Sequence, residues 1–508
     1  MILDRYPVFQ LDTVNTSYLL RIGKFGHPEG VYYGAKIDPG SVDSLLTKQA
    51  IQTGSAVLYN AAVDPAYSLD TVRLEWSGVG CGDYRQTPAE IKLGDGSFRT
   101  DFVYDSHRIL PGCLPMQTLP SAYADPAAAD TLEITLKDEI ANLTLLLIYT
   151  VFAETDVITR RAVLLNSGTE RVVIRRLMSL QLDLENNGYS LVTLDGAWIK
   201  ETHRHDRKLQ YGQFVNSSTT GASGNRHNPA FSLYEHGANE TYGNVYGFNL
   251  VYSGNHLGLA ELSPTDLVRV QIGINPHCFE WPLAAGESFE TPEAVMTFSD
   301  RGFNGMSAHF HDFVNNHIVR GESQNAERPV LINNWEACFF KFTRGKLLRL
   351  ARQAKRLGVE LFVLDDGWFG KRDNDKAGLG DYSVNKKKLP WGMRSFAGEI
   401  HRLGLKFGLW FEPEMVNPDS DLFRAHSEYA VQTPNRRALM GRNQLVLDLC
   451  NPEVRDYIVD NVSRILDDAG IDYVKWDMNR HISDAYSPLL SCQGEFYHRY
   501  IMGLYDIL

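Results

Sequence analysis

Residues 471–480, IDYVKWDMNR, combine the apolar pattern of a β-strand with a cluster of charged and amide side chains. Side chains alternate along a strand, so Lys475, Asp477 and Asn479 share one of its faces. A carboxylate nucleophile has to be ionised at neutral pH, and a lysine two residues before it favours the charged form. The pattern therefore predicts a reactive Asp477 at the carboxyl end of a strand.

The segments before this strand repeat one unit, a helix stopped by glycine and followed by an apolar strand. One helix stops at Gly358, one at Gly404, and one begins at Asn451 and stops at Gly470. The apolar face of the first helix is formed by Leu347, Leu348, Ala351, Ala354 and Leu357. Such units indicate a parallel sheet, and polar clusters at the strand ends favour a (β/α)8 barrel. We expect its first five strands near residues 330–335, 359–365, 405–411, 445–449 and 471–477.

The first part of the chain has a different pattern. Short runs of alternating polarity, such as residues 132–136, are separated by Gly, Asn and Asp turns and contain few helical periods. They predict a large antiparallel β-sandwich over residues 1–300. Apolar residues at helical spacing then indicate a linker helix in residues 301–328, which closes the sandwich, and the barrel domain follows at 329–508.

Polar and aromatic side chains gather where the expected barrel strands end. These clusters are Asn333-Asn334-Trp335-Glu336, Asp365-Asp366-Gly367-Trp368, Trp410-Phe411-Glu412-Pro413-Glu414, Arg442-Asn443-Gln444 and Asp448. Indole faces cover the C–H face of a pyranose, and carboxylates and amides bond to its hydroxyls, so the mixture favours a sugar site. In a retaining glycosidase one carboxylate attacks the anomeric carbon, and a second carboxyl about 5 Å away protonates the leaving oxygen. Asp477 is the nucleophile candidate.

Longer motifs make the interpretation specific. The runs PVLINNWEA, LDDGWFGKR, FGLWFEPEMVNPDSDL, RNQLVLDLCNPEV and YVKWDMNR, in this order and spacing, resemble glycoside hydrolase family 36, the bacterial α-galactosidases. GCGDYRQTP at Gly80–Pro88 resembles a loop of that family, and the similarity covers nearly the whole chain. The resemblance implies a β-supersandwich followed by a (β/α)8 barrel. It also implies hydrolysis of terminal α-linked galactose from melibiose, raffinose and stachyose with retention.

On matching positions, the resemblance makes Asp477 the nucleophile. It places in the galactose pocket Trp335, Asp365, Asp366, Trp410, Arg442, Lys475 and Asn479. Asp365 and Asp366 would point to opposite faces of a regular strand, so a bulge or bend is needed for both to reach the sugar. Structural alternatives stay open, because Asp365-Asp366-Gly367 also fits a type I′ turn, and Trp335 and Trp410 also fit core positions.

One feature departs from the family pattern. Family members carry a general acid/base Asp well after the nucleophile strand, following a Cys/Ser/Gly-rich loop, and this sequence ends at Leu508 before either. Residues 329–508 supply five of the eight strands that a barrel requires. We therefore expect a fragment that lacks the catalytic acid and is nearly inactive alone on melibiose.

Composition argues against several other functions. The formal charge of −12, with acidic and basic residues interspersed, leaves no basic stripe for nucleic acid. Asp4 and Arg5 lie where a secretory signal needs its apolar core. No apolar run approaches membrane-spanning length, and the longest, residues 143–153, fits a buried strand. Six cysteines without a C-x-x-C pair indicate no disulfide framework and favour a reducing, cytoplasmic setting.

The signals for metal and nucleotide chemistry are weak. His203-x-His205 and His309-x-His311 have ligand-like spacing but no evident third ligand, so solvated histidines are the better interpretation and we expect no metal. No phosphate loop or G-x-G-x-x-G fingerprint follows a strand, and we expect no cofactor.

Two functions other than hydrolysis stay open. A galactosyltransferase on the same scaffold would pass galactosyl units to sugar acceptors through the same covalent intermediate. A non-catalytic galactose-binding remnant would bind the sugar, or self-associate through the sandwich, without forming that intermediate. The family resemblance also implies a homo-oligomer, a tetramer in the complete protein, in which the Gly80–Pro88 loop would border a neighbour's pocket.

Overall fold

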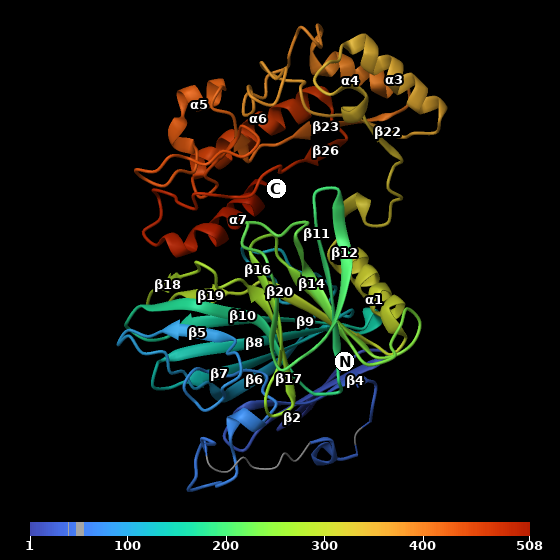
Figure 1. Cartoon of the computed structure of the whole chain (residues 1–508). Helices are drawn as coiled ribbons and strands as arrows, with labels where there is room; N and C mark the ends of the chain where they lie inside the picture. Colours follow the sequence, from blue (N-terminus) through green and yellow to red (C-terminus); the bar gives the residue numbers. More distant parts are fainter. Residues whose placement is uncertain (39, 47–54) are drawn as a thin grey trace. The chain divides into compact units, whose positions relative to one another are not determined.

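The structure is a computed structural model that describes residues 1–38, 40–46 and 55–508. It divides into two compact units, Met1–Gln324 and Asn325–Leu508 (Figure 1). Antiparallel sheets build the first unit, and a parallel sheet with helices builds the second. None of the helices in these residues is long and apolar enough to cross a membrane.

Three antiparallel sheets form the first unit over the residues described. The four-stranded sheet has the order β1 (Ile2–Arg5), β2 (Val8–Asp12), β3 (Thr16–Ile22), β4 (Pro28–Ala35). The six-stranded sheet has the order β13 (Gly212–Ser217), β16 (His256–Leu262), β17 (Leu267–Ile274), β10 (Val172–Glu185), β18 (Trp281–Leu283), with β5 (Ala89–Lys92) also on β10. The ten-stranded sheet has the order β12 (Lys200–Lys208), β11 (Ser190–Ala197), β14 (His227–Tyr234), β15 (Val245–Val251), β20 (Glu293–Ser299), β9 (Val157–Asn166), β8 (Leu143–Phe152), β7 (Asp130–Asp138), β6 (Val103–Pro111), with β19 (Ser288–Glu290) also on β9. Short 3-10 turns are η1 (Val42–Leu45), η2 (Leu69–Thr71), η3 (Ala153–Thr155) and η4 (Gly321–Ser323).

The core of the first unit lies along its central strands. Every residue of β16 and β17 is buried. β8, with the sequence LTLLLIYTVF, is buried at eight of its ten positions. The prediction that residues 143–153 form a buried strand is therefore confirmed.

A buried ion cluster ties the Gly80–Pro88 loop to the sandwich. Asp183 of β10 accepts hydrogen bonds of 2.8 and 2.8 Å from Arg269 of β17 and one of 3.0 Å from Arg85. Asp83 pairs with Arg85 at 2.8 Å and with Arg269 at 2.7 Å. Burial alone would raise the pKa of Asp83, but the two guanidinium groups hold it below its usual value. The loop is thus anchored in the unit that carries it.

β12 is an edge strand of the ten-stranded sheet, and Figure 1 draws β11 and β12 as a long hairpin. All nine residues of β12 are exposed, and all except Thr202 are Lys, Arg, Asp, Glu or His. His203 and His205 are therefore solvated, as predicted. At the hairpin turn, Trp198 is 82% exposed and Ile199 is 73% exposed.

The helix α1 (Gly302–His317) lies in the interval predicted as a linker, and it packs on the sandwich. Phe313 of α1 meets Phe152 of β8 edge to face, with ring centroids 4.9 Å apart. His309 is buried, and its Nδ1 lies 2.9 Å from Oγ1 of Thr297 on β20. The expectation of a solvated His309 is wrong, because the helix face that carries it is covered by the sheet.

The second unit is built on four parallel strands. Their order is β21 (Leu331–Asn333), β22 (Leu361–Leu364), β23 (Lys406–Phe411), β26 (Tyr473–Trp476). The helices are α2 (Trp335–Cys338), α3 (Arg344–Arg356), α4 (Gly392–Arg402), α5 (Asp421–Ala425), α6 (Pro452–Ala469) and α7 (Phe496–Ile507). The 3-10 turns are η5 (Ser427–Tyr429) and η6 (Gln493–Glu495). This is the predicted strand–helix alternation.

The strand expected at residues 445–449 does not join the parallel sheet. Its first two residues form β25 (Leu445–Val446), which pairs antiparallel with β24 (Met415–Val416). Arg442 and Asn443 have φ values of +52° and +60°, so the chain enters through a tight turn and not from a long helix. The count of five parallel strands over this region is therefore wrong, and β26 directly neighbours β23.

The helix boundaries follow the predicted capping residues. Asn451 accepts a hydrogen bond from the N–H of Glu453, Pro452 occupies the first turn of α6, and Gly470 ends the helix with a φ of +62°. The predicted apolar face of α3 is buried except for Leu357, which is 85% exposed. Leu357 lies just past the last residue of α3, where the helical period no longer directs it inward.

Asp183→Ala should lower the free energy of unfolding of the first unit by about 3–5 kcal/mol, because two buried guanidinium groups then share one carboxylate. Urea unfolding measures the change. The exposed pair of Arg204 and Asp206 provides the control, since Asp206→Ala should cost about 0–1 kcal/mol. Equal effects of the two substitutions would contradict a stabilising role for the buried cluster.

Candidate active site

The carboxyl ends of the four parallel strands bring the predicted site residues of the second unit to one edge of the sheet. Asn333 ends β21, Asp365 follows β22, Glu412 follows β23 and Asp477 follows β26. The strands pair in parallel along the whole series. In α/β sheets this edge is where ligands bind.

Asp477 has one oxygen held by the protein and one much freer. Its Oδ2 accepts hydrogen bonds from Nε1 of Trp410 at 2.9 Å and from Nδ2 of Asn479 at 2.6 Å. Its Oδ1 accepts only a longer bond of 3.2 Å from the N–H of Met478. The side chain is half-buried. Oδ1 is therefore the oxygen that can approach an electrophile.

Lys475 pairs with Asp365 and not with Asp477. Its ammonium nitrogen lies 2.7 Å from Oδ2 of Asp365, and the amide of Asn333 donates to the same oxygen. The backbone of Asp365 is held by Oδ1 of Asn334 at 2.8 Å. The sequence predicted that Lys475 would keep Asp477 ionised, but no direct contact joins this ammonium to the carboxylate of Asp477.

The carboxylate of Asp366 binds Arg372. The guanidinium of Arg372 donates hydrogen bonds of 2.8, 2.9 and 3.1 Å to the two oxygens of Asp366. Burial raises the pKa of Asp366, and Arg372 opposes that shift. Arg372 also donates to Oδ1 of Asn417 at 2.9 Å. The two residues remain in contact, because the main-chain N–H of Asp366 donates to Oδ1 of Asp365 at 2.8 Å, but their carboxylates pair with different cations, Lys475 and Arg372.

The two tryptophans predicted for the pocket lie in different environments. Trp410 is only 2% exposed, and its ring lies nearly parallel to that of Phe369, with centroids 6.2 Å apart. It acts on Asp477 through its N–H and not through an open face. Trp335 is partly exposed and meets Phe339 and Phe340 edge to face. Trp335 is the indole that can offer a face to a ligand.

Arg442 and Asn479 continue the contacts of Asp477. The guanidinium of Arg442 donates to Oδ1 of Asn479, whose Nδ2 donates to Asp477. Arg442 is exposed and adopts a positive φ. The predicted residues Trp410, Arg442, Asn479 and Asp477 are therefore linked in one network.

Glu412 belongs to the same network, although the sequence placed it only in a polar cluster at a strand end and not among the pocket residues. Its Oε1 accepts a 2.8 Å hydrogen bond from the N–H of Asn479, and its Oε2 accepts one of 2.9 Å from Nε2 of Gln444. Burial, together with the nearby Asp477 carboxylate, raises the pKa of Glu412 to about 7. Its position directly after a parallel strand, like that of Asp365 and Asp477, was the signal that could have identified it.

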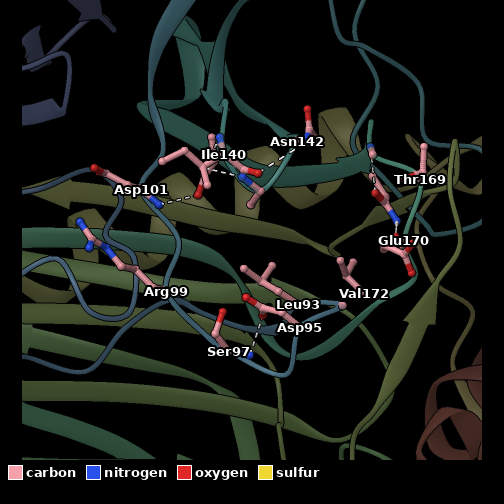
Figure 2. A pocket seen from close by; sticks show the side chains of 15 residues that line it. Leu93, Asp95, Ser97, Arg99, Asp101, Ile140, Asn142, Thr169, Glu170 and Val172 are labelled. Carbon is pink, nitrogen blue, oxygen red and sulfur yellow. Dashed lines mark hydrogen bonds between the residues drawn. The ribbon is translucent and has the colours of Figure 1, made fainter.

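A cavity of about 450 Å³ in the first unit has a different character. Figure 2 shows its lining side chains, which come from loops around residues 93–101, 138–142 and 166–172. Asp101 is bonded to His27 and Tyr59, and Asp138 accepts the N–H of Asp101 at 2.8 Å. These carboxylates are engaged in hydrogen bonds within the first unit, so we take the strand-end network as the candidate active site.

Across the described part of the chain, no three His, Cys, Asp or Glu residues are grouped to hold a metal ion.

Comparisons with known proteins agree with this geometry. A family model described as Melibiase matches residues 288–508, and one described as the glycosyl hydrolase family 36 N-terminal domain matches residues 26–284. α-Galactosidase AgaA of Geobacillus stearothermophilus is 42% identical over 504 residues, which are 98% of this chain and 69% of the relative. α-Galactosidase 1 of Pediococcus pentosaceus is 39% identical, covering 99% of this chain and 68% of its own length.

Solved structures give the same result. The crystal structure of the family 36 α-galactosidase AgaB from Geobacillus stearothermophilus has a TM-score of 0.96 at 40% identity, covering 100% of this chain and 70% of that one. Variants of AgaA from the same organism, in complex with raffinose and with stachyose, have TM-scores of 0.95 and 0.96 at 41% identity. Each covers 98% of this chain and 70% of the variant.

The parallel-strand site and these matches define the class of protein, which is a glycoside hydrolase. The predicted fold class, an antiparallel β-supersandwich followed by strands and helices of a (β/α)8 barrel, is confirmed. The chain belongs to glycoside hydrolase family 36, the family of the α-galactosidases that it matches.

Asp365→Ala and Asp366→Ala should have different effects. Asp365→Ala should weaken galactose binding by about 1–3 kcal/mol, because sugar hydroxyls lose an acceptor. Asp366→Ala should mainly lower the free energy of unfolding, by about 3–5 kcal/mol, because Arg372 is buried and loses its charged partner. Calorimetric titration and urea unfolding separate the two quantities. A loss of affinity in Asp366→Ala with unchanged stability would place Asp366 in the pocket instead.

Proposed function

We propose that this protein is an α-galactosidase that removes terminal, non-reducing α-D-galactose from oligosaccharides such as melibiose, raffinose and stachyose, with net retention. The observation that carries the proposal is the hydrogen bonding of Asp477. Its Oδ2 accepts hydrogen bonds from Trp410 and Asn479, whereas its Oδ1 accepts only the longer bond from the N–H of Met478. The raffinose and stachyose complexes of AgaA variants support the substrate class.

The proposed reaction has two steps. Oδ1 of Asp477 bonds to C1 of galactose while the C1–O bond to the leaving sugar breaks, and the leaving oxygen takes up a proton. The oxygen of water then bonds to C1 while the C1–Oδ1 bond breaks and the water loses a proton to solvent, which releases α-galactose and the Asp477 carboxylate. Trp410 and Asn479 keep the carboxylate plane fixed through both displacements, so little reorganisation is needed when the bond forms.

Sugar recognition would come from groups around Asp477. The ammonium of Lys475 and the carboxylate of Asp365 form a pair that can bond to adjacent hydroxyls, and Lys475 is partly exposed. Trp335 would cover the C–H face of the ring. Arg442 and Asn479 would complete the polar rim, while Asp366 would contribute through Arg372. These roles rest on the observed contacts and on the family resemblance.

We propose that the proton donor for the leaving group is not one of the carboxyls bonded around Asp477. Both oxygens of Glu412 and both oxygens of Asp366 accept hydrogen bonds from other residues of the protein, so neither carboxyl is free to reach a leaving oxygen. Departure of an unactivated sugar depends on such a donor. The residues of this sequence would then perform nucleophilic attack far better than acid catalysis.

We also propose a cytoplasmic protein that forms a homotetramer in its complete form. The six cysteines are all free, which suits a reducing compartment. The tetramer follows from the family resemblance, and light scattering gives the molar mass that tests it.

Asp477→Asn should abolish covalent labelling by 5-fluoro-α-galactosyl fluoride while galactose still binds, because the amide keeps the shape of the side chain but cannot attack. Intact mass and peptide mapping locate the adduct. Asp472→Asn is the matched control, since Asp472 precedes the same strand and bonds His401 and Phe407. An adduct that persists in Asp477→Asn would move the nucleophile elsewhere.

The 508-residue chain should hydrolyse α-galactosyl fluoride much faster than melibiose, because fluoride leaves without a proton donor. Relative to a full-length family member, turnover of melibiose should be lower by about 10²- to 10⁴-fold. Steady-state rates on both substrates provide the comparison. Melibiose turnover near that of the relative would show that these residues include the acid.

A further inference from the structure

Two buried carboxylates follow β23 with one proline between them, and they have different partners. Glu414 is 2% exposed and accepts hydrogen bonds from Nε1 of Trp476 at 3.0 Å and from the hydroxyl of Tyr500 at 2.9 Å. Glu412 is 1% exposed and accepts the N–H of Asn479 at 2.8 Å. Of these two carboxylates, Glu412 is the one that contacts the turn after the nucleophile strand.

Asn479 is held at three points. Glu412 accepts its main-chain N–H, Arg442 donates to its side-chain oxygen, and its Nδ2 donates to Asp477 at 2.6 Å. The contact with Asp477 is short and directional, so it requires a fixed backbone position. Glu412 supplies that fixed position from a neighbouring strand.

We propose that Glu412 is a positioning residue of the reaction, which fixes the backbone of Asn479 and thereby orients the carboxylate of Asp477. The inference rests on the proposed function of Asp477 as nucleophile. Glu412 does not touch the sugar, because both of its oxygens are engaged by the N–H of Asn479 and by Gln444.

The charge of Glu412 changes near neutral pH. Burial raises its pKa from 4.5 to about 7, and the Asp477 carboxylate adds to the shift. The N–H of Asn479 and the charge of Arg372 act in the opposite direction. Tyr382, whose own pKa is raised by burial and by Glu412, also faces it.

Gln444 can bond to Glu412 in either protonation state. Its Nε2 donates to the carboxylate, and its Oε1 is buried without a partner among the residues described. Half a turn of the amide lets that Oε1 accept a hydrogen bond from the O–H of the neutral carboxyl. Oε1 of Glu412 accepts the N–H of Asn479 in both states, so positioning and titration are compatible.

The test measures how fast 5-fluoro-α-galactosyl fluoride labels Asp477 in the full chain. Glu412→Leu removes the acceptor and should slow labelling by about 10- to 100-fold with unchanged affinity for galactose. Glu412→Gln keeps an acceptor for Asn479 and gives the orphan oxygen of Gln444 a donor. It should label within about three-fold of the unsubstituted chain near pH 7.

Glu414→Leu and Glu414→Gln are the matched controls. Glu414 lies in the same segment and is as buried, but its partners are Trp476 and Tyr500. Both control variants should label within about three-fold of the unsubstituted chain per folded molecule, even if they unfold more easily.

The pH dependence gives a second measurement. Ionised Glu412 adds negative charge beside the positive charge that develops on the sugar, so labelling should rise several-fold as pH increases through about 7. Glu412→Gln should lack this step. Because the folded pKa is raised, the stability that neutral Glu412 contributes is lost as pH rises through about 7. The melting temperature of the unsubstituted chain should therefore fall relative to that of Glu412→Gln as the pH rises from about 5 to about 8.

Equal slowing by Glu412→Leu and Glu414→Leu would overturn the proposal, as would unchanged labelling in Glu412→Leu. If the leucine variant does not fold, the pH profile decides, and a step near pH 7 that persists in Glu412→Gln overturns it. Absence of labelling in the unsubstituted chain would instead overturn the proposed function, and this inference with it.

Discussion

One main-chain hydrogen bond sets the geometry on which the candidate site depends. The N–H of Asp477 donates to the carbonyl of Phe411 at 2.8 Å and extends the pairing of β23 with β26 one residue past the end of β26. This register puts Asp477 beside the indole of Trp410 and puts Asn479 within reach of Glu412. A slip of one residue would send the carboxylate to the opposite face of the sheet. The pairing of two strands therefore fixes the chemistry at their ends.

The acidic residues at the strand ends differ in their neighbours more than in their own chemistry. Asp365 is paired with the ammonium of Lys475, and Asp366 with the guanidinium of Arg372. Glu412 is buried among neutral amide donors, and its pKa rises accordingly. Asp477 has neutral donors on one oxygen and keeps partial contact with solvent. Carboxylate side chains at neighbouring strand ends thus have different environments because their partners differ.

Much of the architecture could be predicted from local sequence signals. The capping of α6 by Asn451, Pro452 and Gly470 is local chemistry, and so is the alternation of apolar strands with helices. The prediction of a parallel strand at 445–449 was wrong because it relied on apolar content. The positive φ values of Arg442 and Asn443 decide the path of the chain there. The prediction that Leu357 is buried was wrong because this residue lies beyond the end of the helix, where the helical period no longer holds.

The site was less predictable, because its contacts cross between strands. The sequence places Lys475 two residues from Asp477, yet the ammonium reaches across the sheet to Asp365. Asp366 could not be assigned to Arg372 without knowing how the loop after β22 folds back. Glu412 stands directly after an apolar strand, as Asp365 and Asp477 do, but its burial and its hydrogen bond with the N–H of Asn479 are seen only in the structure.

The exposed edge of the ten-stranded sheet has a consequence for how this protein behaves when concentrated. An open edge offers unpaired N–H and C=O groups that another chain can extend into a continuous sheet. On β12, eight of nine side chains are Lys, Arg, Asp, Glu or His, and all nine are exposed. Any incoming strand would have to bring its own side chains against these charges and strip their water. The edge strand therefore protects a large β-sheet from growing into fibres.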